Sequence, residues 1–240
     1  MARPQRITRE LLLEAAMQLV DTEGLDALTM RRLGERVGAD PAMVYRAFAN
    51  KDELLEALAD RVFSGARDSG HAGAPPNRDD GAEPLERLRQ AAHGIRAALL
   101  AHPALIGVAV RRPPRQEATF RGIDAGLGLL LSCGLTPRDA ARGYQAVLFY
   151  ALGFAVLEAP FSAAPDRGAE QQRQTQSALA ALPAEDYPHV AATAEHLYTP
   201  DLEGQFDYGL RLLLDGLRSR AVAATSTRAA MAVSAGKEPA

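Results

Sequence analysis

The sequence of 240 residues lacks the features that mark a secreted or membrane-embedded protein. Its single cysteine, Cys133, cannot form an internal disulfide, which fits a reducing compartment. No apolar run approaches the roughly 20 residues that a helix needs to cross a bilayer. The first residues, Met-Ala-Arg-Pro-Gln-Arg, are polar and precede no apolar stretch, unlike a signal peptide. We therefore expect a cytoplasmic protein with no membrane partner.

The sequence also lacks the short motifs of common catalytic and metal centres. It contains no HExxH, CxxC, Walker or GxSxG pattern. Its five histidines show no metal-ligand spacing, and no nucleophile stands in a recognisable pattern with a base. We therefore expect no enzyme activity, no bound metal and no cofactor.

The composition is that of an ordinary soluble protein, with 47% hydrophobic and 24% charged residues. The length suffices for one large or two modest domains. Apolar residues recur at the spacing of amphipathic helices along most of the chain, and no segment has a convincing strand pattern. The sequence therefore predicts an all-α fold.

Residues 28–54 have the pattern of two short helices joined by a tight turn, followed by the start of a third helix. Thr29 is a candidate N-cap, because its hydroxyl can accept a free N–H of the first turn. Leu33 and Val37 lie four residues apart and therefore share one face. Gly34 permits another backbone to come close, and Gly38 is suited to end the helix.

Asp40 and Pro41 are typical of the start of the next helix, where an acid caps and proline costs no hydrogen bond. Val44 and Phe48 point inward. This leaves an outer face formed by Pro41, Ala42, Met43, Tyr45, Arg46 and Ala47. A helix-turn-helix places this outer face in the major groove of DNA, although an ordinary helical hairpin would have the same pattern.

Residues Ile7–Phe63 resemble the N-terminal domain of the TetR/AcrR family of bacterial transcriptional repressors. The matching segments are Thr8–Ala16, Glu23–Leu25, Leu28–Gly38, Val44–Phe48 and Asn50–Leu55. The segments Ile95–Pro103, Cys133–Pro137, Tyr150–Glu158 and Phe206–Leu217 look like the C-terminal domain of the tetracycline-repressor branch. The resemblance covers nearly the whole chain, and it is more specific in the first half.

The resemblance implies a homodimer with two helical domains per subunit. We expect a DNA-binding domain at 1–67 and a ligand-binding and dimerisation domain at 83–220. The Ala/Ser/Thr-rich segment 221–240 is predicted to be a disordered tail. Residues 159–188 contain four prolines and are predicted to be mobile, with a helix at about Ala169–Leu182.

Two helices are expected to carry the dimer contact. The helix at about Pro137–Glu158 is apolar nearly all round, and the last helix, about Leu202–Arg220, has a strong apolar stripe. Packed against their copies, they would form a four-helix bundle. The predicted interface residues are Leu148, Leu152, Phe206, Leu210, Leu213 and Leu217.

The resemblance also assigns roles on the DNA face. Thr29, Tyr45 and Lys51 correspond to phosphate contacts, and Arg31 corresponds to a residue that reads a base. Arg46 could bind either a base or a phosphate. Pro41, Ala42 and Met43 offer only apolar contacts, such as those with thymine methyl groups.

Overall charge gives this hypothesis little support, because the net charge is −3. Residues 1–63 carry nine Lys and Arg against eleven Asp and Glu. The positive charges would have to be sorted onto one face, which predicts moderate, salt-sensitive DNA binding. The candidate cations are Arg3, Arg6 and Arg9 on the N-terminal arm and Arg31, Arg32, Arg46 and Lys51 on the helix-turn-helix.

A small-molecule effector is implied by the resemblance, but magnesium-bound tetracycline fits poorly. Ala109 stands where the tetracycline-repressor branch has its metal-binding histidine, and Ala91 stands where it has an earlier polar residue. An apolar or aromatic effector fits better. The predicted lining residues are His93, Ile95, Phe120, Tyr144, Phe149 and Phe154.

The most consistent function is therefore that of a homodimeric repressor that leaves a palindromic operator when a small molecule binds. Two alternatives remain open from the sequence. One is an activator of the same fold. The other is a helical small-molecule-binding protein or enzyme whose helix-turn-helix is only structural.

Overall fold

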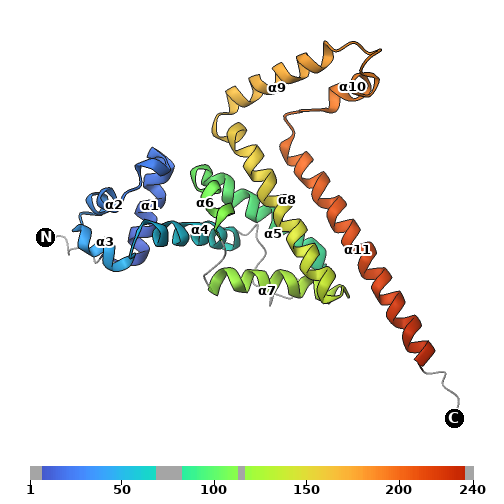
Figure 1. The fold of residues 1–240 in the computed structure, drawn as a ribbon, viewed down its shortest axis with the longest axis horizontal. Coiled ribbons are helices and arrows are strands. Elements are labelled where there is room, and N and C mark those ends of the chain that lie inside the picture. Colours follow the sequence, from blue (N-terminus) through green and yellow to red (C-terminus); the bar gives the residue numbers. More distant parts are fainter. Residues whose placement is uncertain (1–6, 69–82, 113–116, 236–240) are drawn as a thin grey trace.

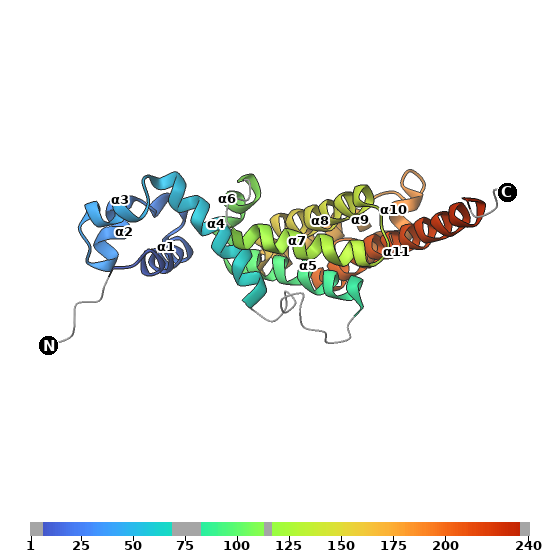
Figure 2. The same ribbon diagram turned by 90° about the horizontal axis from the view of Figure 1, so that it is seen from below.

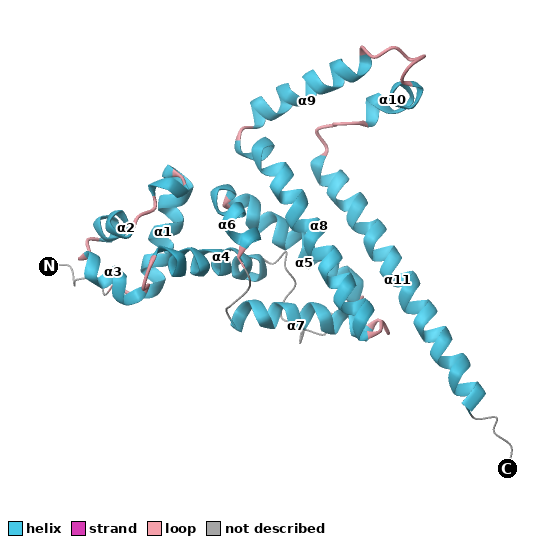
Figure 3. Ribbon diagram, in the orientation of Figure 1, coloured by secondary structure: helices cyan, strands magenta, loops and turns pink. Residues whose placement is uncertain are grey.

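The computed structural model describes residues 7–68, 83–112 and 117–235, and its regular structure within these ranges is helical (Figure 3). The N-terminal part contains α1 (Arg9–Glu23), the short 3-10 helix η1 (Leu25–Ala27), α2 (Met30–Val37), α3 (Pro41–Ala47) and α4 (Lys51–Asp68). The C-terminal part contains α5 (Pro84–Ala101), η2 (Pro103–Leu105), α6 (Ile106–Arg111), α7 (Glu117–Ser132), α8 (Pro137–Ala163), α9 (Pro165–Ala180), α10 (Pro188–Thr193), η3 (Ala194–His196) and α11 (Leu202–Ala235). The predicted all-α fold is confirmed.

The molecule is elongated, with the helix-turn-helix at one end and the last helix at the other (Figures 1 and 2). Helix α4 runs from the N-terminal helices to the centre, where it packs against α5, α6 and α7. Helices α8 and α11 lie side by side in opposite directions (Figure 1). Helices α9 and α10 stand out from the far end of this pair. The fold therefore separates a small helical head, α1–α4, from a larger helical body, α5–α11. Helix α4 connects the two parts.

Two clusters of buried apolar side chains hold the molecule together. The first occupies the centre of α1–α4 and continues into α5, η2 and α8 through residues such as Leu99, Leu105 and Ala155. The second joins α5, α7, α8 and α11, with Leu130, Phe206 and Leu210 fully buried. Because the first cluster crosses from head to body, the two parts share a core and can transmit strain to each other.

The end of the chain differs from the sequence prediction. Helix α11 continues to Ala235, so the predicted disordered tail is wrong for residues 221–235, and 236–240 lie outside the described residues. Alanine is the strongest helix former, and the alanines of this segment extend a helix already anchored by its buried first half. The side chain of Ala221 is still buried against the body.

Helix α8 is also longer than predicted, and it includes Pro160. Its segment Pro137–Ser162 is long and apolar enough to cross a membrane, with a mean hydropathy of 1.4. Charged residues interrupt this segment at Arg138, Asp139, Arg142 and Glu158, so it is not a continuous apolar run. A core helix of a soluble protein has the same properties, so this single segment is weak support for a membrane span.

Candidate nucleic-acid interface and effector region

The geometry of α2 follows from three residues. The hydroxyl of Thr29 accepts a hydrogen bond from the N–H of Arg32 at 3.1 Å and so caps the helix. Gly38 ends it with φ of 67°, in the left-handed region that glycine adopts without strain. A Cβ on Gly34 would lie 2.9 Å from the carbonyl oxygen of Ala39, so glycine is required for the tight turn. These local contacts fix the angle at which the next helix leaves.

Helix α3 begins as the sequence predicts. The Asp40 carboxylate accepts a hydrogen bond from the N–H of Ala42 at 2.8 Å, and Pro41 occupies the first helical position. The side chains of Val44 and Phe48 are completely buried in the first core cluster. The opposite side is exposed, with Tyr45 54% and Met43 38% accessible. Exposed large side chains on a helix whose inner face is fully packed suggest a contact surface.

All eight predicted DNA-binding residues are exposed. They come from the start of α2, the outer side of α3 and the start of α4. The set is Thr29, Arg31, Pro41, Ala42, Met43, Tyr45, Arg46 and Lys51. Arg31 lies 3.7 Å from Glu35, which is a long contact. Within the described ranges no ion pair of Arg46 or Lys51 is found, so both cations can meet a ligand.

Other arginines of the head face protein groups instead. Arg32 and Arg36 both pair with Glu23 at the end of α1, and Arg32 is therefore engaged away from the presumed DNA face. Arg9 pairs with Glu53 of α4. Arg3 and Arg6 lie outside the described residues. The sorting of charge onto the DNA face thus depends on fewer cations than the sequence suggested.

The six residues predicted to line an effector pocket do not share one site. His93 and Phe154 lie together, each within 5.2 Å of the Phe206 ring, centre to centre. Tyr144 instead packs against Gly126 of α7, and Ile95 packs against both core clusters. Phe120 and Phe149 are 51% and 63% exposed. The structure of the single subunit therefore does not gather these six side chains around one cavity, because the helical stripes turn them in different directions.

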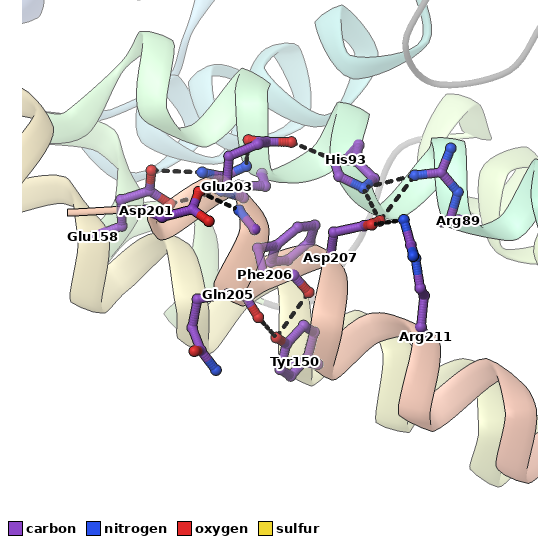
Figure 4. A network of polar contacts seen from close by, with 12 residues as sticks. Arg89, His93, Tyr150, Glu158, Asp201, Glu203, Gln205, Phe206, Asp207 and Arg211 are labelled. Carbon is purple, nitrogen blue, oxygen red and sulfur yellow. Dashed lines mark hydrogen bonds and ion pairs between the residues drawn. The ribbon is translucent and has the colours of Figure 1, made fainter. Parts of the chain in front are cut away.

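The group around Phe206 combines aromatic rings with a buried ion pair (Figure 4). Arg96 donates two hydrogen bonds to the carboxylate of Glu158, at 2.6 and 2.7 Å, and both side chains are less than a tenth exposed. The Arg96 guanidinium lies 4.8 Å from the centre of the Phe206 ring. Burial lowers the pKa of Arg96, but the hydrogen bonds that Arg96 donates to Glu158 and Glu203 outweigh burial and raise the pKa overall.

A second set of charges continues from this pair towards the start of α5. Asp207 accepts a hydrogen bond from Arg89 at 2.9 Å and lies 3.3 Å from His93 Nε2 (Figure 4). Arg211 also pairs with Asp207. Burial raises the pKa of Asp207, but the contacts with His93 and Arg89 and the charge of Arg211 lower it overall. These contacts fasten α11 to α5 through charged groups.

Sequence reasoning missed Arg96, Glu158 and Asp207. Arg96 lies on the same side of its helix as Ala92 and Leu99, which are both buried. Glu158 follows a long apolar stretch that contains no other acid after Asp139. A charged residue in an apolar stripe is rarely buried unless paired, and this signal could have identified both partners.

An open depression of about 340 Å³ lies between the start of α5 and the middle of α11. Its lining contains mainly charged side chains and none of the six predicted effector residues: Glu83, Leu85, Glu86, Arg89, Arg211, Leu214, Asp215 and Arg218. The charges neutralise each other, since Arg218 pairs with Glu83 and Asp215. This depression differs from the apolar pocket expected for an aromatic effector.

Half of the predicted dimer-interface residues lie inside the subunit. Phe206, Leu210 and Leu217 are buried in the second core cluster, so their assignment to a surface is wrong. Leu148, Leu152 and Leu213 are partly buried. The strong stripe of α11 packs against α5 and α8 of its own chain, which explains the error.

Other large apolar side chains of α8 and α11 are exposed. They are Phe149, Val156 and Leu157 on α8 and Tyr208, Leu212 and Val222 on α11. Leu157 is 74% and Leu212 is 58% accessible. Several large apolar side chains on two adjacent helices exceed the scattered exposure that is normal for a surface.

Polar contacts of α4 with α7 and with the residue after α6 help to join the head to the body. Arg112, directly after α6, donates a hydrogen bond to the Asp52 carboxylate at 2.8 Å and lies 3.5 Å from Glu56. The hydroxyl of Thr119 in α7 donates to Asp60 at 2.9 Å. Burial raises the pKa of Asp60. Both contacts act on α4, the helix that carries the head.

Comparison with known proteins agrees with this architecture. The family model described as "Bacterial regulatory proteins, tetR family" matches residues 12–58. The model described as "Tetracyclin repressor-like, C-terminal domain" matches residues 76–221. The two matches thus cover the helix-turn-helix and most of the helical body.

Individual relatives match over nearly the whole chain. The class C tetracycline repressor protein of Escherichia coli is 30% identical, over 88% of this chain and 91% of its own. The repressor DrrR1 of Streptomyces coeruleorubidus is 30% identical, over 90% and 80%. The structure of ActR from Streptomyces coelicolor in complex with actinorhodin is 27% identical, with a TM-score of 0.78 over 90% of this chain and 99% of ActR.

The fold, the exposed outer face of α3 and the tetracycline-repressor-like body lead to the same conclusion as these matches. The functional class is regulation and not catalysis. The chain belongs to the TetR family and is a helix-turn-helix transcriptional repressor.

Proposed function

We propose that the protein acts in the cytoplasm as a homodimer that represses transcription from a palindromic operator and is released by a small molecule. The observation that carries the DNA-binding part is α3, whose inner residues Val44 and Phe48 are fully buried while its outer side chains are free. In this geometry the outer face of α3 enters the major groove. A two-fold dimer then reads two half-sites in opposite orientation.

Selection of bound DNA from a random pool tests this proposal. The expected product is an inverted repeat whose half-sites lie about one helical turn or more apart. A reporter gene placed behind the selected operator should be silenced by the protein. Enrichment of no motif would contradict operator binding, and stimulation of the reporter would indicate an activator.

The dimer contact is proposed to use the exposed side chains of α8 and α11 instead of the buried stripe. Two copies packed through these helices would form a four-helix bundle and cover Phe149, Leu157, Tyr208 and Leu212. Covering them removes apolar surface from water, which favours association. Sedimentation at micromolar concentration should give a dimer, and a monomer would contradict the proposal.

The effector is proposed to be an apolar or aromatic small molecule that binds among α5, α7 and α8 and moves α4. ActR, a relative of similar fold, was solved with actinorhodin. The contacts of Arg112 and Thr119 with α4 supply a mechanical link, since a shift of α6 or α7 would pull on the helix that carries the head. A ligand releases DNA only if it binds better to the conformation that fits DNA poorly.

Magnesium-bound tetracycline is a compound with which the proposed effector class can be tested. Ala109 and Ala91 offer no polar or metal-binding group at the two positions where the tetracycline-repressor branch has them. Tetracycline with Mg²⁺ should therefore leave the operator complex intact, whereas actinorhodin is the first aromatic compound to test. Release by magnesium-bound tetracycline at low micromolar concentration would contradict the proposed effector class.

A further inference from the structure

Helix α3 has only seven residues and therefore cannot be stable through its own hydrogen bonds. Its end has no glycine cap, because Phe48 follows in an extended conformation. The carbonyl groups of a last helical turn have no partner within the helix. The position of α3 must therefore depend on groups from other elements.

Arg9, the first residue of α1, supplies such a group. Its Nη1 donates a hydrogen bond to the carbonyl oxygen of Ala47, the last residue of α3. The guanidinium lies 4.1 Å from the centre of the Phe48 ring. A cation at the C-terminal end of a helix is also favoured by the helix dipole. Arg9 thus contacts the end of α3 through a hydrogen bond, a ring contact and its charge.

Glu53 of α4 completes the arrangement. Its Oε1 lies 3.1 Å from Nη1 of Arg9, and its Oε2 accepts a hydrogen bond from the N–H of Ala49 at 2.8 Å. The bond from Ala49 and the contact with Arg9 lower the pKa of Glu53. One carboxylate therefore binds the segment after α3 and the arginine that holds the end of α3.

We propose that Arg9 and Glu53 form a brace that sets the position of the recognition helix α3, and that Arg9 is a positioning residue and not a phosphate contact. The inference rests on the proposed role of α3 in the major groove. It assigns to Arg9 a different role from the general positive charge of an N-terminal arm. It also gives Glu53, an acid close to the DNA face, a reason to be there.

The two roles of Arg9 predict opposite effects for Glu53. If charge alone mattered, Glu53→Ala would remove a negative charge beside DNA and strengthen binding. If the brace positions α3, Glu53→Ala weakens operator binding although the protein becomes more positive. Arg9→Ala should weaken operator binding about tenfold, because it removes a charged hydrogen bond. The double variant should be no weaker than the worse single variant, since both changes break one unit.

Arg61→Ala is the matched control. Arg61 of α4 pairs with Glu10 of α1 at 2.6 Å and is about as exposed as Arg9, but this pair joins α1 to α4 without contacting α3. Its loss removes the same charge from the same domain. Operator affinity of Arg61→Ala should stay within about twofold of the wild type. Arg9→Lys should recover part of the affinity, because an ammonium can still donate to Ala47 and Glu53.

The experiment measures affinity for the selected operator and for random DNA over a series of salt concentrations, with hydrogen exchange at the amides of Phe48 and Ala49. The brace predicts that Arg9→Ala keeps the wild-type salt slope, loses specific affinity and speeds exchange at Ala49. If Arg9→Ala proves unfolded, Arg9→Lys and Glu53→Ala provide the same comparison.

Three results would overturn the proposal. The first is a salt slope reduced by about one unit in Arg9→Ala, which would mark a phosphate contact. The second is stronger operator binding by Glu53→Ala. The third is equal operator affinity of Arg9→Ala and Arg61→Ala. If the wild type itself selects no operator, the proposed function fails. If the wild type binds and Arg9→Ala binds equally well, only the brace fails.

Discussion

The head and the body of this repressor bury different kinds of core. In α1–α3 the buried side chains are apolar, and the caps join residues only two to four positions apart. In the body, the ion pair of Arg96 and Glu158 joins residues 62 positions apart. The comparison teaches that the helix boundaries of the head are specified by local pattern, whereas the core of the body depends on partners that meet only after folding.

The largest expected effect on stability comes from removing the acid of the buried ion pair. Glu158→Ala would leave the buried Arg96 with only the exposed Glu203, which should cost about 3–5 kcal/mol of unfolding free energy. The melting temperature should fall by roughly 10 °C. Calorimetry would measure both quantities.

Glu203→Ala is the control for that change. Glu203 also contacts Arg96, but its side chain is 67% exposed, so its loss should cost about 1 kcal/mol or less. Equal losses in the two variants would show that burial of the pair does not determine its contribution.

The next largest effect should come from the surface of the body. Leu212→Glu places a charge on an exposed leucine of the proposed dimer contact. The dimer should dissociate, and operator affinity should fall by about 100-fold or more, because the two half-sites would no longer be bound together. Sedimentation and gel shift would measure this.

Leu131→Glu on α7 gives a matched control, since Leu131 is also exposed, at 45%. It should leave both the dimer and DNA binding intact. Dissociation by Leu131→Glu with an intact Leu212→Glu dimer would move the contact to α7.

Smaller effects should separate the roles of cations in the head. Lys51→Ala should weaken binding to all DNA sequences and reduce the salt slope by about one unit, because a phosphate contact carries no sequence information.

Arg31→Ala should relax the preference at one base position per half-site, by about 1–3 kcal/mol. Selection with Arg46→Ala would decide whether Arg46 reads a base or a phosphate. An unchanged motif in Arg31→Ala would exclude base reading there.

The smallest effect concerns Asp60, the buried acid between head and body. Burial raises its pKa, so its charged form is disfavoured in the folded state. Because of this raised pKa, the free energy of unfolding decreases as pH rises from the pKa of Asp60 in the unfolded chain to its pKa in the folded protein. Above the folded-state pKa the full loss of stability is present. Asp60→Asn should therefore raise the melting temperature at neutral pH by about 1–3 °C. It should also flatten the pH dependence of stability, and a lower melting temperature would contradict this reasoning.

Much of the head could be predicted because each determinant lies close to its effect in sequence. Thr29, Gly38 and Asp40 act on groups two to four positions away. The partners of Arg32 and Arg9 were not foreseeable, since Glu23 and Glu53 reach them only across helices.

The body was harder to predict for a related reason. An apolar stripe shows that a helix side is covered, but not whether its own chain or a second copy covers it. The stripe of α11 therefore predicts Phe206 and Leu210 at the dimer contact, although both pack inside the subunit. The predicted effector residues pose the same problem, because Phe120 and Phe149 have the right chemistry but are exposed in the single subunit.

The hydroxyl of Thr29 can both accept and donate a hydrogen bond. Its oxygen accepts the N–H of Arg32, which leaves its proton available to a neighbouring acceptor such as a phosphate oxygen. An aspartate at this position could still accept the N–H and cap α2. It would, however, present a negative charge and no proton to the DNA backbone. A substitution at this position can therefore preserve the fold of the chain and still abolish its binding to the operator.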